Sequence, residues 1–363
     1  MRITRIKLHM VNVPERKGWW SDDTYGQPLH QRDVHGVAEI ETDEGLTGLT
    51  QIERMTPLDT ILAGLESWLS LDVMAVNLNQ LEPPMVASLE QAVLDLRGQA
   101  LGVPVWQLLG GKLRDSTPVT QCTGYKTPEH TAEDAQWGWE HGFRAYKMKC
   151  ITENETTPEE RICYVTDRIE AIHRVLPDMV VRPDIRWRLK EVWVAQELAR
   201  RLDGHRIDCF ESPIERRASS GTFSEWTRLR QSIPFPIADH VSDSEELVKV
   251  FEARAMDYAI VGTFSHLETL RQSHLAHQLG MGGWGQTVSY GPGAAMGLHV
   301  TACMPNLTQP YDMVGPMAWE DTLLNEDFAF ENGAFLTPDR AGLGFTLNHQ
   351  AVEKYRVSEH VLE

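Results

Sequence analysis

The sequence predicts an α/β fold in which a (β/α) barrel carries a second, smaller α+β unit. From about residue 116, short apolar strands alternate with amphipathic helices at intervals of roughly 25–35 residues, which is typical of a parallel sheet. Both ends of the chain read as β, whereas the stretch 57–112 reads as helical. The chain has 363 residues, 42% of them hydrophobic, so it is long enough for a barrel and one further unit.

The first unit is expected to begin with three strands. Residues 3–13 and 37–42 alternate between apolar and polar side chains, and a turn at 43–45 leads back into a strand at 46–51. The stretch 17–26 between the first two strands is polar, aromatic and flanked by glycine, and it reads as a loop.

A helix and the tail complete this unit. Leu89, Ala92 and Leu96 recur at helical spacing, and the helix is expected to end at Gly102. The tail turns β-like again and is expected to return to the first unit. We therefore expect an α+β domain of residues 1–115, completed by 330–363, and a barrel of residues 116–329.

Seven barrel strands are predicted, at residues 118–122, 145–149, 180–185, 208–211, 236–240, 258–262 and 283–287. The helices between them include 158–175, 191–202 and 244–254. That many strand–helix units favours closure into a barrel over an open sheet.

Composition excludes several classes of protein. Asp and Glu number 52 against 34 Lys and Arg, a net charge of −18, which argues against nucleic acid or an anionic membrane as the main partner. No apolar run is long enough to span a bilayer, and the N-terminus does not resemble a signal peptide, so we expect a cytoplasmic protein. The five scattered cysteines fit neither a disulfide framework nor a structural zinc site.

Polar residues stand at the ends of consecutive predicted barrel strands, where the active site of such a barrel lies. Lys147 and Lys149 end the second strand at i, i+2 and therefore point to the same side. Asp184, Glu211 and His240 end the next three strands, 27 and 29 residues apart. Each alone would fit a solvated edge or a helix cap, but their joint placement at repeat spacing favours a site.

This combination suits one kind of chemistry. Carboxylate ligands with open positions suit Mg²⁺. The metal would stabilise the enediolate that forms when a lysine of lowered pKa removes the α-proton of a carboxylate substrate. The second lysine would depress the pKa of its neighbour and contact the substrate carboxylate.

The chain resembles the enolase superfamily, on its mandelate racemase and muconate lactonizing enzyme side. The resemblance covers nearly the whole sequence and rests on the segments 37–48 (VAEIETDEGLTG), 92–111 (AVLDLRGQALGVPVWQLLGG), 146–149 (YKMK), 210–213 (FESP), 297–306 (GLHVTACMPN) and 341–347 (AGLGFTL). It implies a modified TIM-type barrel under an α+β capping domain whose N-terminal loop closes on the substrate.

The resemblance assigns roles residue by residue. Asp184 and Glu211 match the first two metal ligands, Lys149 the catalytic base and Lys147 its assistant. The third ligand is an acid in most members, whereas here counting from the preceding proline favours His240, with Asp239 as the alternative and Val241 at the racemase-type position. An imidazole ligand would weaken selectivity for Mg²⁺ over softer metals.

Two positions depart from the family pattern. Gly262 stands where the sixth strand would carry Lys or Asp, and Gln286 or Gly285 stands near the expected histidine of the seventh. Racemisation and epimerisation need two opposed bases and are therefore disfavoured. A syn elimination or a cycloisomerisation could use Lys149 alone.

Substrate contacts are expected from Arg186, Gln286, Trp20 and Tyr25. Arg186, where the family often has Asn, either binds a substrate anion or pairs with an acid such as Glu211. Trp20 and Tyr25 either contact substrate or anchor the loop on the barrel.

Our first hypothesis is a metal-dependent lyase, a sugar-acid dehydratase, acting on a small carboxylate in a homo-oligomer. The alternatives are a cycloisomerase or a racemase or epimerase of another carboxylate, and a barrel that binds ligand without catalysis.

Overall fold

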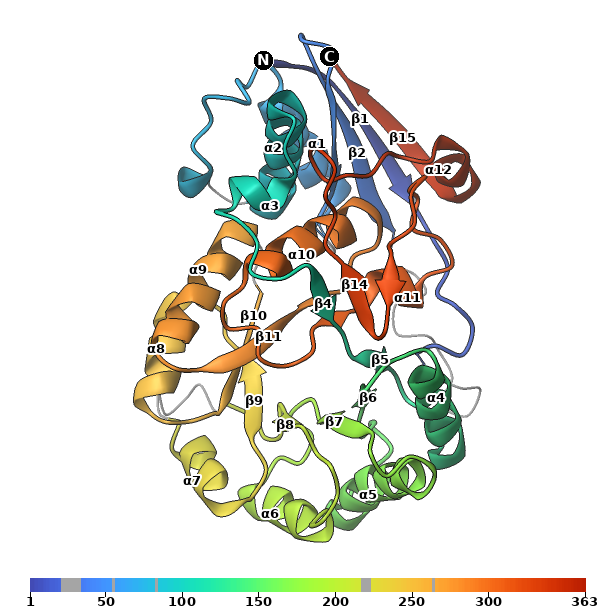
Figure 1. Ribbon diagram of the computed structural model, residues 1–363, viewed down its shortest axis with the longest axis vertical. Helices are drawn as coiled ribbons and strands as arrows, with labels where there is room; N and C mark the ends of the chain where they lie inside the picture. The colour runs from blue at the N-terminus through green and yellow to red at the C-terminus, as the bar shows by residue number, and fades with distance from the viewer. Residues whose placement is uncertain (21–33, 54–55, 82–83, 217–222, 263–264) are drawn as a thin grey trace.

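The computed structural model describes residues 1–20, 34–53, 56–81, 84–216, 223–262 and 265–363 (Figure 1). Its largest sheet has eight strands in the order β12-β11-β10-β9-β8-β7-β6-β5, and all neighbouring pairs are parallel. The strands are β5 (Gln121–Thr123), β6 (Ala145–Lys149), β7 (Val180–Asp184), β8 (Phe210–Glu211), β9 (Ile237–His240), β10 (Tyr258–Val261), β11 (Gly282–Thr287) and β12 (Asp312–Met313).

The two outer strands of this sheet meet and close a barrel. Val119 and Tyr311, which precede β5 and β12, form a parallel bridge, and the amide of Thr120 donates to the carbonyl of Tyr311 at 3.0 Å. The predicted barrel is therefore confirmed. The prediction lacked β12, and it merged β5 with β4 (Ser116–Pro118), which belongs to another sheet.

Helices follow the strands in turn and lie on the outside of the barrel (Figure 1). They are α4 (Pro128–Glu140), α5 (Pro158–Val175), α6 (Val192–Arg201), α7 (Ser224–Ser232), α8 (Ser244–Glu252), α9 (His266–Gln278) and α10 (Gly291–Cys303), with the short α11 (Gly315–Ala318) after β12. Helix α5 begins with a capping box in which Thr157 and Glu160 satisfy each other's backbone amides.

A separate antiparallel sheet forms the cap, in the order β15-β1-β2-β3. Its strands are β1 (Ile3–Val11), β2 (His35–Thr42), β3 (Thr47–Gln51) and β15 (Arg356–Leu362). Its helices are α1 (Leu58–Trp68), the 3₁₀ turn η1 (Leu78–Gln80), α2 (Val86–Leu101) and α3 (Val105–Leu108). As predicted, the long helix α2 ends at Gly102, whose φ of +68° suits glycine.

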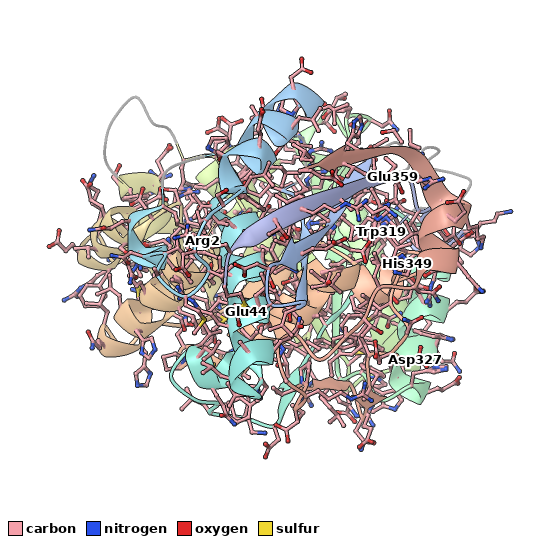
Figure 2. The ribbon with its side chains drawn as sticks, turned by 90° about the horizontal axis from the view of Figure 1, so that it is seen from above. Arg2, Glu44, Trp319, Asp327, His349 and Glu359 are labelled. Carbon is pink, nitrogen blue, oxygen red and sulfur yellow. The ribbon has the colours of Figure 1, made fainter. Side chains whose placement is uncertain are left out.

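The tail of the chain divides between two sheets. The hairpin of β13 (Phe330–Glu331) and β14 (Ala334–Leu336) pairs with β4 beside the barrel. After α12 (His349–Tyr355), strand β15 pairs antiparallel with β1, so both termini lie at the cap end of the molecule (Figure 1). Figure 2 looks down on this end, with His349 on α12 and Glu359 on β15. The expected domain boundaries at 115/116 and 329/330 stay a prediction.

The barrel interior holds a small apolar cluster of Cys209, Ala238, Ile260 and Trp284, one residue from each of four neighbouring strand segments. Side chains two positions further along face the same interior, because strand residues alternate between faces. All five cysteines are free, as expected. Within the described ranges, no helix is long and apolar enough to cross a membrane.

Candidate active site

Strand β6 brings both predicted lysines into the barrel. Lys149 ends the strand directly opposite Asp184 of β7, and its side chain keeps 20% of its surface exposed. Lys147 lies one step deeper and is only 1% exposed. Lys149 is therefore the lysine that a substrate entering the barrel mouth would meet. Lys147 is too deeply buried to make the expected contact with a substrate carboxylate.

Lys147 is surrounded by three carboxylates. Its Nζ lies 2.7 Å from Glu211 Oε1, 2.7 Å from Asp312 Oδ2 and 3.4 Å from Asp184 Oδ2. Burial alone would lower the pKa of Lys147, but these anions raise it well above its ordinary value. Lys147 is thus a fixed positive charge beneath the mouth of the barrel.

Lys149 pairs directly with Asp184. Burial is the largest single effect on Lys149 and disfavours its charge, as does repulsion from Lys147, yet Asp184 and the other acidic groups nearby together outweigh both, so the pKa of Lys149 is raised. This corrects the expectation of a lowered pKa, because a carboxylate, and not only a second lysine, contacts the ammonium. Burial likewise opposes ionisation of Asp184, but Lys149 and Lys147 hold its pKa well below the usual range.

Glu211 is the predicted ligand with spare capacity. Its Oε1 accepts from Lys147, while its buried Oε2 has no hydrogen-bond partner among the described residues. Burial, together with the adjacent charge of Asp184, raises the pKa of Glu211 to about 8. A buried carboxylate oxygen without a partner is costly unless another cation binds there.

The alternation along β9 separates the two candidates for the third ligand. His240 faces the interior, with its Nε2 3.9 Å from Glu211 Oε1. Asp239 faces the other way, where it accepts from Ser212 Oγ at 2.6 Å, Trp187 Nε1 at 3.1 Å and Arg216 Nε at 2.8 Å. The geometry therefore favours His240 over Asp239.

These groups are also the candidate ligands of the expected metal. In the part of the chain that the structure describes, no three His, Cys, Asp or Glu side chains converge to hold a metal ion. Lys149 and Lys147 instead take the contacts of Asp184 and of Glu211 Oε1. Two carboxylates on adjacent strands, one with an orphaned oxygen, and a nearby imidazole nevertheless form a donor set whose chemistry fits a divalent cation.

The far side of the barrel mouth carries no base at the two expected positions. Gly262 follows β10 with a φ of +149°, and Gln286 of β11 is exposed. The sheet order sets β10 four strands from β6 in the eight-stranded barrel, and hence opposite Lys149.

The predicted substrate contacts are only partly brought together. Arg186 donates to the Tyr125 hydroxyl at 2.7 Å and borders a hollow of about 430 Å³ that Ile151 and Trp187 also line. The ion pair with Glu211 is not formed, since the salt bridges of the described residues include none for Arg186. A larger hollow of about 660 Å³ lies between α2 and α9, away from these residues.

Of the two aromatic residues expected to contact substrate from the loop, Trp20 lies within the described residues. Trp20 is 3% exposed, and its carbonyl oxygen lies where a β-carbon on Gly124 would sit. This backbone contact places Trp20 beside the end of β5, and whether its ring contacts substrate or only anchors the loop stays a prediction. Tyr25 lies outside the described residues.

One residue of the site was missed. Asp312, on the unpredicted strand β12, is 1% exposed and contacts Lys147. The only sequence signal for it was an acid 26 residues beyond Gln286, close to one strand–helix interval.

The chain is similar to known enzymes in sequence. The family model described as "Enolase C-terminal domain-like" matches residues 130–351, more than half of the chain. The N-succinyl-L-Arg/Lys racemase of Bacillus cereus is 24% identical over 100% of both chains. Muconate cycloisomerase 1 of Pseudomonas putida is 28% identical over 74% of this chain and 71% of its own length.

Solved structures share the fold. The crystal structure of the Bacillus cereus racemase superposes with a TM-score of 0.82 at 21% identity over 100% of both chains. That of 2-chloromuconate cycloisomerase from Rhodococcus opacus superposes with a TM-score of 0.85 at 18% identity, covering 99% of this chain and 100% of that one. At these identities the likeness establishes the architecture alone.

Proposed function

Because the chain belongs to the enolase C-terminal domain-like family, in the mandelate racemase and muconate lactonizing subgroup, we propose that it isomerises a small carboxylate substrate by one-base proton transfer at the α-carbon. Its racemase and cycloisomerase relatives support a metal-dependent enzyme that abstracts a proton. The proposed reaction is a cycloisomerisation with Lys149 as the base.

The observation that carries this choice is the glycine opposite Lys149. A racemase removes a proton on one face of the α-carbon and returns one on the other, so it needs two groups that exchange protons. Gly262 has no side chain, and the Gln286 amide is not a useful acid or base near neutral pH. A cycloisomerisation uses one face and one base.

Lys149 would move the proton between its Nζ and the substrate. In the forward direction, a substrate carboxylate oxygen adds to a carbon–carbon double bond, and the Lys149 ammonium gives a proton to the carbon α to the second carboxylate. In the reverse direction, Lys149 removes that proton and the carbon–oxygen bond breaks. Each forward turnover consumes one proton from solvent, which restores the Lys149 ammonium, and the reverse reaction releases one; no oxidant or reductant is required.

A divalent cation, for which we propose Mg²⁺, would be held by Asp184, Glu211 and His240. When bound, it supplies positive charge that stabilises the charge developing on the substrate carboxylate. Arg186 and Gln286 would bind the remaining polar groups of the substrate, and Trp20 would fix the edge of the pocket.

Two other reactions are alternatives to cycloisomerisation. Sugar-acid dehydration, the first hypothesis from the sequence, could use the same base but is not the activity named for either of the two relatives reported above. Racemisation has such support, but the two described positions expected to carry the opposed base hold Gly262 and Gln286. We also propose that the protein is a homo-oligomer.

The test is to incubate single enantiomers of N-acylamino acids, five-membered lactone acids, unsaturated dicarboxylates and sugar acids with the enzyme and Mg²⁺ in D₂O. Proton NMR and chiral chromatography follow each. We expect deuterium at the α-carbon with retained configuration and interconversion of a lactone with its open acid. Inversion at the rate of exchange would indicate a racemase, and loss of water a dehydratase. Absence of exchange from the whole panel would favour a ligand-binding barrel.

A further inference from the structure

We propose that Asp312 is a positioning residue that acts through Lys147 on the carboxylate of Glu211. This inference rests on the proposed function, because it takes Glu211 to be a ligand of the divalent cation. Asp312 is 1% exposed and comes from β12, on the other side of the barrel closure from Lys147.

Asp312 accepts from donors on several strand segments. Its Oδ1 accepts from Thr120 Oγ1 at 2.6 Å and Arg182 Nη1 at 3.2 Å. Its Oδ2 accepts from Trp284 Nε1 at 3.1 Å and Lys147 Nζ at 2.7 Å. A buried carboxylate with this many donors is held in one place even before Lys147 is considered.

The groups that hold Asp312 are themselves fixed. Arg182, which is fully buried, pairs with Asp208 through Nε at 2.7 Å and Nη2 at 2.6 Å. Its guanidinium also stacks on the ring of Trp284, 3.7 Å from the centroid. Asp312 is therefore a rigid anchor for the ammonium group of Lys147.

Asp312 is also the neighbour of Lys147 with no other assigned task. Among the described residues, the other carboxylates that pair with Lys147 are Glu211 and Asp184, which are the proposed cation ligands. Without Asp312, the whole charge of Lys147 would fall on these two carboxylates and compete with a cation for them. Asp312 thus holds the Lys147 ammonium where it orients Glu211 Oε1 and leaves Oε2 without a partner among the residues that the structure describes.

Isothermal titration of the substrate-free protein with MgCl₂ tests this inference. We expect Asp312→Asn to weaken Mg²⁺ binding about tenfold or more, as is typical when a group behind a metal ligand is lost. Asp95→Asn is the control, since it removes a buried carboxylate of the cap that contacts the amides of Leu49 and Leu343 and none of the groups around Lys147. The control should bind Mg²⁺ within about threefold of wild type. Equal weakening in both variants, or none in Asp312→Asn, would overturn the proposal.

A second variant separates position from charge and serves if Asp312→Asn does not fold. Asp312→Glu keeps the negative charge but displaces it by one methylene, so we expect binding about fivefold weaker or worse. Wild-type affinity in Asp312→Glu would overturn the proposal. A wild-type protein that binds no Mg²⁺ would overturn it together with the proposed metal. If instead Mg²⁺ binding responds as expected while no substrate exchanges its α-proton, only the proposed reaction fails.

Discussion

Asp184 and Glu211 are register partners at the ends of β7 and β8, yet their surroundings move their pKa values in opposite directions. Burial acts against ionisation in both. The lysine contacts of Asp184 reverse that effect and lower its pKa. Burial and the charge of Asp184 raise the pKa of Glu211 to about 8, and one of its oxygens has no partner in the described part of the chain. Asp184 is thus stabilised as an anion by lysines even when no metal ion is bound, whereas Glu211 is not.

The first prediction concerns the stability of the metal-free protein. Ionisation of Glu211 is less favourable in the folded protein than in the unfolded chain. The free energy of unfolding should therefore decrease as pH rises from about 4.5 to about 8. In EDTA at pH 9, Glu211→Gln should be as stable as wild type or more so. Asp184→Asn breaks a buried ion pair and should lose about 1–3 kcal/mol. Urea unfolding measures both, and a Glu211→Gln protein less stable than Asp184→Asn would contradict the account.

The second prediction concerns the third ligand. His240→Ala should weaken Mg²⁺ binding by about tenfold or more, because it removes a direct donor. Asp239→Asn should instead lower stability, because Asp239 accepts from Ser212, Trp187 and Arg216. A crystal structure with Mg²⁺ in which His240 turns away from the ion would refute this ligand.

The third prediction concerns two buried groups that clamp the backbone of Leu343. Asp95 accepts from the Leu343 amide at 2.8 Å, and His299 Nε2 donates to the Leu343 carbonyl at 3.1 Å. Burial raises the pKa of Asp95 to about 6 and lowers that of His299 to about 4. The stability that Asp95 contributes is therefore lost as pH rises from about 4 to about 6, because the folded protein holds its proton more tightly. The stability that His299 contributes is lost as pH falls from about 6.5 to about 4, because only the unfolded chain gains a proton there.

Each of these slopes is worth about 3 kcal/mol, and they oppose each other in the wild type. In His299→Gln only the Asp95 effect remains, so the free energy of unfolding of this variant should fall as pH rises from about 4 to about 6. Asp95→Asn should show the reverse. Urea unfolding across this pH range measures both, and parallel pH profiles for the two variants would show that the clamp is misassigned.

The fourth prediction concerns the contact between the backbone of Trp20 and Gly124. A β-carbon on Gly124 would lie 1.4 Å from the Trp20 carbonyl oxygen, so the backbone there must move if a side chain is added. Gly124→Ala should cost about 1–3 kcal/mol of stability, and Gly124→Ser more, because both overfill a packed contact. Wild-type stability by urea unfolding in both variants would show that Trp20 does not pack there in solution.

Much of the fold was predictable because its elements carry regular patterns. Strand β6 and helix α5 have the predicted bounds, since a run of inward and outward residues and a Thr-Pro capping signal define them. Strand β12 has two residues and lies just after Pro310, too short for any periodicity to appear. Asp312 was missed for that reason.

The site was predictable in its composition but not in its pairing. The strand ends identified the lysines, Asp184 and Glu211 as neighbours. Choosing between Asp239 and His240 required the phase of β9, which a four-residue strand does not reveal in the sequence. The raised pKa of Lys149 depends on a contact across two strands, and only the folded chain forms that contact.

The central claim is that Lys149 alone moves the α-proton. The direct measurement is the rate of solvent deuterium incorporation at the α-carbon of a turned-over substrate, by NMR with Mg²⁺ present. Lys149→Ala should lower this rate by about 10²–10⁴-fold, as expected for loss of a general base. Lys249→Ala, at an exposed lysine on α8, should leave it unchanged. Exchange that persists undiminished in Lys149→Ala would contradict the account.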